Sequence, residues 1–172
     1  MASLMENLIS ILETEASEYE ILVGLSTQKT PVIIDGDLTA LQQITDEEQI
    51  VVGRIQRLEK QREEVIGDIA NVINKDVEEL KLTNLIEMLK DRPEESEKLA
   101  LVHDKLKDVL HRMERINEQN RELIKNAMEM VEFDLNVIQS LKTAPETANY
   151  NKGAFTSGDM MGVNEGRFDA KQ

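Results

Sequence analysis

Two histidines and several pairs of acids are the residues whose types and spacing could do chemistry. Asp108 and His111 have the carboxylate-x-x-His spacing of the ligand pairs in di-iron helical bundles. Such a site needs a second pair, but the residue at the matching place before His103 is Ala100, which cannot bind a metal. On a helix the two histidines also lie about two turns apart, too far to share one ion. We therefore interpret both as surface residues.

The acid pairs, such as Glu63–Glu64, lack the companions that catalysis requires. None is flanked by a nucleophile, a base and an anion-binding loop, and the chain has no cysteine and no glycine-rich phosphate loop. In a chain with 34 acidic residues, adjacent acids are expected on solvated helix faces. We therefore predict that the protein is not an enzyme and has no catalytic residue, no metal site and no cofactor.

A pair of amides interrupts an otherwise apolar line in a long helical segment. The line runs in steps of three and four residues, with Asn120 in one of its positions and Asn117 beside it. We interpret both amides as a register-setting part of the core, each hydrogen-bonded to another helix. An unpaired buried amide would cost about 1–3 kcal/mol. The apolar members of the line are Leu99, Val102, Leu106, Val109, Met113, Ile116, Leu123, Ala127 and Met130.

The apolar periodicity predicts the elements that must position these residues. Pro31, Pro93 and Pro145 each lie where the periodicity breaks, because proline cannot continue a helix interior. The segment 144–172 holds four of the eight glycines and no sustained pattern, which predicts an extended or disordered C-terminal tail. The rest, 3–143, is one helical domain. Its helices are expected over about 3–29, 37–74, 82–90 and 93–142.

The second of these helices has polar interruptions of its own. From Leu41 to Val72 its seam alternates in steps of three and four, and Glu48 and Arg62 are the charged exceptions. Long helices with such seams pack side by side at shallow angles. We therefore predict an all-α fold: an elongated, antiparallel, coiled-coil-like bundle of three long helices, with a short extra helix and an irregular tail.

Charge and composition restrict the partners. A net charge of −14 and the lack of a basic cluster argue against a nucleic-acid surface and an anionic membrane as partners. No apolar run reaches the roughly 18 residues of a membrane span. The N-terminal residues also lack the basic and apolar regions of a signal peptide. We expect a cytoplasmic protein that binds neither nucleic acid nor membranes.

The last helix has more apolar residues than one seam needs. A helix that borders one seam needs an apolar stripe about 100° wide, but here the stripe covers more than half of the circumference. The excess predicts a second, partner-facing surface; alternatively, the bundle is broad there or the chain self-associates. The residues concerned are Leu123, Ile124, Ala127, Met128, Met130, Val131, Phe133, Leu135, Ile138 and Leu141.

Three segments together resemble the flagellar export chaperones of the FlgN type. In Asp35–Ile66 a Gly-Asp turn leads into a Leu-rich helix that ends with Leu58, Glu59 and Arg62. Leu106–Phe133 contains an Asn-x-x-Asn-x-x-Leu-Ile pattern, and Asn149–Phe155 is a tyrosine-containing segment with a glycine. The likeness extends from about residue 4 to 155.

The resemblance implies a non-catalytic chaperone of the bacterial cytoplasm. Such proteins bind the terminal amphipathic helices of the hook-associated proteins at the hook–filament junction, keep them unassembled and deliver them for type III export. They also contact components of the export apparatus. The rival hypothesis is a structural or self-assembling coiled-coil adaptor. The client-binding residues that the resemblance and the apolar excess indicate together are Leu123, Ile124, Ala127, Met128, Val131, Leu135, Ile138 and Leu141.

Overall fold

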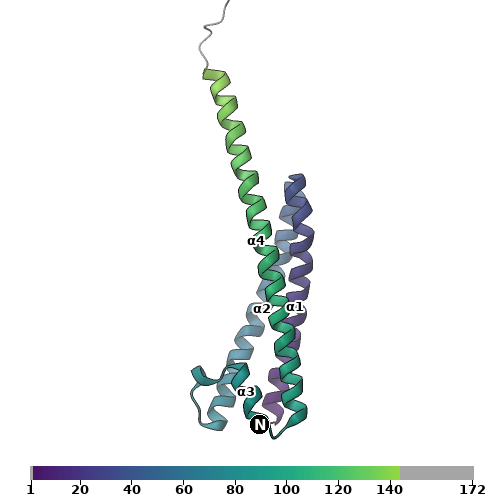
Figure 1. Cartoon of the computed structure of the whole chain (residues 1–172), viewed down its shortest axis with the longest axis vertical. Coiled ribbons are helices and arrows are strands. Elements are labelled where there is room, and N and C mark those ends of the chain that lie inside the picture. The colour runs from purple at the N-terminus through teal and green to yellow at the C-terminus, as the bar shows by residue number, and fades with distance from the viewer. Residues whose placement is uncertain (1, 144–172) are drawn as a thin grey trace, which may run out of the picture. The chain divides into compact units, whose positions relative to one another are not determined.

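The computed structural model describes residues 2–143, and its secondary structure in that range is entirely helical (Figure 1). The all-α class is therefore confirmed. The expected tail, 144–172, lies outside the described residues. The elements are α1 (Ala2–Asp35), α2 (Leu38–Ile73), the 3₁₀ helix η1 (Val77–Glu79), α3 (Leu82–Met88) and α4 (Pro93–Thr143).

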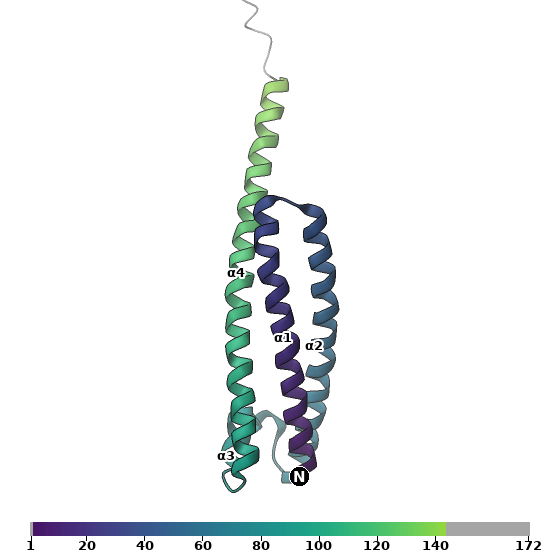
Figure 2. The ribbon, with the colours of Figure 1, turned by 90° about the vertical axis from the view of Figure 1, so that its right-hand side faces the viewer.

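A tight turn joins α1 to α2, and the two helices lie side by side (Figure 2). Gly36 adopts a positive φ of 68°, which glycine accepts without steric cost. Asp37 then caps α2, because its Oδ1 accepts a hydrogen bond of 3.0 Å from the backbone N–H of Ala40. The Gly-Asp pair in the sequence therefore reverses the chain and starts the second long helix.

The first helix is longer than expected, because α1 continues through Pro31 to Asp35. A proline in a helix interior costs about 3 kcal/mol, since it lacks an N–H and its ring meets the carbonyl of Thr27. Continuing the helix buries Ile33, whose side chain is only 7% exposed. Burial of a side chain of this size contributes about 1.5–3 kcal/mol, so tertiary packing offsets most of the local penalty.

Residues 1–129 form one compact unit with a single hydrophobic core. α1, α2, α3 and α4 all contribute to this core. It contains aliphatic side chains and methionines, as the scarcity of aromatics requires. The buried residues from α4 follow the apolar line that the sequence predicts: Leu99, Val102, Leu106, Val109 and Met113.

The second unit begins at Met130, and its described part is the end of α4, residues 130–143. Every residue in this range is exposed. None of the helices in residues 2–143 combines the length and the apolar character that a bilayer crossing requires.

Candidate functional site

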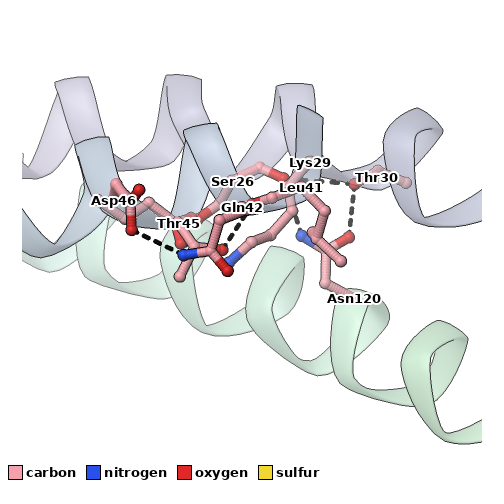
Figure 3. Close-up of polar contacts among 9 residues, drawn as sticks. Ser26, Lys29, Thr30, Leu41, Gln42, Thr45, Asp46 and Asn120 are labelled. Atoms are coloured by element: carbon pink, nitrogen blue, oxygen red, sulfur yellow. Dashed lines mark hydrogen bonds and ion pairs between the residues drawn. The ribbon is translucent and has the colours of Figure 1, made fainter. Parts of the chain in front are cut away.

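The polar interruptions of the two seams each reach a side chain or a carbonyl of α1. Asn120 of α4 is 4% exposed, and its Nδ2 donates a hydrogen bond of 2.8 Å to the carbonyl oxygen of Ser26. Thr30 Oγ1 donates in turn to Asn120 Oδ1 at 2.6 Å. Figure 3 shows Ser26 and Thr30 of α1 and Asn120 of α4 turned toward one another. The NH₂ group and the carbonyl oxygen of the Asn120 side chain therefore both have a hydrogen-bond partner on α1.

The same stretch of α1 also holds the first charged interruption of α2. Ser26 Oγ donates a hydrogen bond of 2.8 Å to Glu48 Oε1, and Lys29 forms an ion pair with the other carboxylate oxygen. Ser26 thus contacts α4 through its carbonyl and α2 through its hydroxyl. The result is a polar cluster of Ser26, Lys29, Thr30, Glu48 and Asn120 that links three helices.

The second charged interruption of α2 forms a separate pair with α1. Arg62 Nη1 donates to both carboxylate oxygens of Glu15, at 2.9 and 3.2 Å. Glu15 is only 2% exposed. Burial raises the pKa of the Glu15 carboxyl, and nearby Glu59 raises it further, while Arg62 acts in the opposite direction. The arginine makes it possible to bury a carboxylate inside an aliphatic core.

A third ion pair joins α1 to α4 nearer the surface. Arg112 pairs with Glu20 of α1, and its Nε donates to Asp108 of α4 at 2.9 Å. The hydrogen bond from Arg112 lowers the pKa of the Glu20 carboxyl. In the part of the chain that the structure describes, every buried side-chain nitrogen or oxygen has a hydrogen-bond partner. The buried polar groups of these residues therefore hold one another in place between the helices.

Asn117 corrects one expectation from the sequence. It is exposed, whereas Asn120 is buried, so the structure does not place it in the polar core. Ile116, immediately before it, is half-buried against the core. The border of the seam therefore passes between these two neighbouring residues of α4.

The predicted client-binding residues of the first unit lie where α4 becomes exposed. Leu123 is half-buried, whereas Ile124, Ala127 and Met128 are exposed. The last three of these residues are therefore more accessible to a partner than Leu123 is.

In the second unit, all four of the predicted client-binding residues are exposed: Val131, Leu135, Ile138 and Leu141. Three further large apolar side chains in the same range are also exposed: Met130, Phe133 and Val137. The apolar residues predicted to be in excess included Met130 and Phe133, but they did not include Val137. Its spacing of four residues from Phe133 and from Leu141 was the signal that could have found it.

The histidines form no metal centre in the structure. His103 Nδ1 lies 3.2 Å from Asp104 Oδ1, and His111 Nδ1 lies 3.9 Å from Glu114 Oε2. Across residues 2–143, no three histidine, cysteine or acidic side chains gather in a way that could hold an ion.

Comparison with known families decides the identity. A family model described as "FlgN protein" matches residues 1–157. The chain belongs to the FlgN family. No curated protein and no solved structure matches it. FlgN proteins are flagellar export chaperones, a family of chaperones rather than enzymes, and they bind flagellar hook-associated proteins.

Proposed function

We propose that this FlgN protein binds the terminal amphipathic helices of the junction proteins between hook and filament. It keeps them unassembled in the bacterial cytoplasm and delivers them to the export apparatus. The observation that carries this proposal is the exposure of the large apolar side chains in residues 130–143 of α4. Family membership supports the class of client.

The spacing of the exposed residues suits a helical client. Val131, Leu135 and Ile138 follow one another by four and three residues, so they form one stripe along the helix. An amphipathic helix can lay its own apolar stripe along such a face. A client helix of this kind must remain covered until assembly, because its apolar side would otherwise associate too early.

The binding must also be reversible, because the client is released at export. Met128 and Met130 are 67% and 69% exposed. Their unbranched thioether side chains adapt to differently shaped partners. The two methionines lie about 160° apart around the helix axis, so they belong to different sides of α4. Each gives its own side an adaptable contact, which suits binding to more than one junction protein without rigid complementarity.

We further propose that α1, α2 and α4 work as an elongated, antiparallel, coiled-coil-like bundle whose register the polar contacts of α1 set. Asn120, Glu48 and Arg62 each find their partners on α1. A sliding of one helix by a turn would leave these groups buried without partners.

A pair of neighbouring substitutions tests the client site. Leu135→Glu places a charge among the exposed apolar residues, whereas Asn136→Glu places the same charge about 100° away, on the polar side of the helix. With purified full-length chain and a hook–filament junction protein, we expect Leu135→Glu to weaken binding at least about tenfold, because burying a charge without a partner is costly. Asn136→Glu should bind within about threefold of wild type.

The two possible failures have different meanings. Equal binding by the Leu135→Glu and Asn136→Glu variants would contradict the site. No binding of any junction protein by the wild-type chain would contradict the function itself. Isothermal titration calorimetry measures both outcomes.

The exposed apolar residues also suit a second candidate function, a self-assembling coiled-coil adaptor. In that case the same residues would join copies of this chain, and the oligomer would grow with concentration. Sedimentation velocity over a hundredfold range of protein concentration distinguishes the two candidates. A constant monomer favours the chaperone, and a rising sedimentation coefficient that Leu135→Glu abolishes favours the adaptor.

A further inference from the structure

A single carboxylate lies within the exposed apolar side of the second unit. The positions three and four residues before and after Asp134 are those that lie beside it on the helix surface. All four hold large apolar side chains, and all four are exposed, as is Asp134 itself. The four neighbours are Met130, Val131, Val137 and Ile138.

The other charges of this stretch are not adjacent to Asp134 on the helix surface. Glu132, two residues before Asp134, is about 160° away around the helix axis. Lys142, the only basic residue in 130–143, is eight residues beyond Asp134, about 12 Å along the helix axis. The neighbouring helix positions therefore supply no counter-charge to Asp134.

A partner that covers these apolar side chains must also cover Asp134. Removing a carboxylate from water without a counter-charge costs several kcal/mol. A partner with only apolar side chains at this point would pay that cost in full, whereas a partner with a guanidinium or an ammonium group there would largely avoid it. An arginine can form two parallel hydrogen bonds to the carboxylate.

We infer that Asp134 is a specificity-determining residue that selects client helices carrying an arginine or lysine within their apolar stripe. This inference rests on the proposed function, since it concerns the same exposed side of α4. The apolar neighbours supply binding energy to any amphipathic helix, and Asp134 discriminates among such helices through the cost of leaving it unpaired.

The same carboxylate disfavours one way of pairing two copies of this chain. In a two-fold symmetric, antiparallel pair centred on this part of α4, the two Asp134 side chains would approach each other. Residues 130–136 contain no basic residue, so neither copy could supply a counter-charge there. Like charges brought together in a desolvated interface cost several kcal/mol. A client helix with a basic residue therefore fits the surroundings of Asp134 better than a second α4 in this alignment does.

The test uses the full-length chain, a peptide of the C-terminal helix of a hook–filament junction protein, and the same peptide with its arginines and lysines replaced one at a time by methionine. Binding is measured by fluorescence anisotropy for wild type, Asp134→Asn and the control Glu132→Gln. Both substitutions remove one negative charge from the same exposed helix, so long-range electrostatic effects are matched.

We expect Asp134→Asn to weaken binding of the native peptide about tenfold or more, because it leaves the client's cation unpaired. Glu132→Gln should change it less than about twofold. One methionine-substituted peptide should bind wild type more weakly but should no longer distinguish wild type from Asp134→Asn, which identifies the paired cation.

Two results would overturn the inference. If the wild-type chain binds the peptide and Asp134→Asn binds as tightly as Glu132→Gln, the inference fails while the proposed function stands. If the wild-type chain binds neither the peptide nor the intact junction protein, the proposed function fails and the inference fails with it.

Discussion

The amide of Asn120 makes two hydrogen bonds that a leucine at the same position could not make. Its nitrogen donates to the carbonyl of Ser26 and its oxygen accepts from Thr30. Apolar contacts along a seam tolerate a shift by one turn, because the next turn offers a similar surface. Two directed hydrogen bonds exist at one alignment only, so under the proposed register-setting role we expect this residue to favour a single pairing of α4 with α1.

Replacing the amide by a carboxylate of the same shape tests this role. Asn120→Asp removes the donor to Ser26 and places a negative charge against a carbonyl oxygen, in a cluster that already contains Glu48. We expect the free energy of unfolding at pH 7 to fall by about 2–3 kcal/mol. Urea denaturation followed by circular dichroism measures the change.

The matched control is the exposed amide three residues earlier on the same helix. Asn117→Asp introduces the same charge in water, so it should change the free energy of unfolding by less than about 0.5 kcal/mol. Equal destabilisation by Asn117→Asp and Asn120→Asp would show that charge on α4, rather than the buried hydrogen bonds, causes the loss.

At the scale of the elements, Pro31 shows how packing competes with local preference. The proline is exposed, so its ring contributes little to the core. Pro31→Ala restores an N–H for the carbonyl of Thr27 and removes the steric conflict of the ring. We expect the free energy of unfolding to rise by about 1–2 kcal/mol, less than the full 3 kcal/mol difference in helix propensity because the unfolded chain also gains freedom.

Pro31→Gly separates the two causes of that gain. Glycine also restores the N–H and removes the ring, but it is a poor helix former. It should therefore stabilise the protein less than alanine does. A lower stability for Pro31→Ala than for wild type would mean that the proline favours the end of α1 instead of straining it.

The sequence predicted the seams well and the borders of the helices less well. Leu99, Val109 and Asn120 repeat at helical spacing over many turns, and a repeat of that length allows few interpretations. The extension of α1 to Asp35 accompanies the burial of Ile33, and no local sequence pattern reveals that burial. The prediction that Asn117 belongs to the core was wrong for a similar reason. Only the neighbouring helix decides on which side of Ile116 the seam ends.

The exposure of the client-binding candidates was the least predictable feature. An apolar residue on a helix has the same sequence signal whether it is core or interface. The width of the stripe indicated that some residues were in excess, and the structure shows which ones: Leu123 is half-buried, whereas Leu135 and its neighbours are exposed.

For the whole molecule, the two parts of α4 should differ in local stability. Residues 99–113 carry buried side chains of the core, so their amide hydrogen bonds open only when the core does. Residues 130–143 are all exposed, so their helix depends on propagation from the preceding turns and on intrinsic propensity. In hydrogen–deuterium exchange of the free chain, amides of 130–143 should exchange much faster than those of 99–113.

Client binding should reduce this difference in exchange rate between the two parts of α4. A ligand present at 100 times its dissociation constant stabilises the bound conformation by about 2.7 kcal/mol, which would slow exchange in 130–143 by up to about a hundredfold. Residues 99–113 serve as the internal control and should change little. Exchange measured by mass spectrometry with saturating junction-protein peptide gives the result. Unchanged exchange in 130–143 would contradict a client site there, and protection that grows with the concentration of the free chain would instead favour self-assembly.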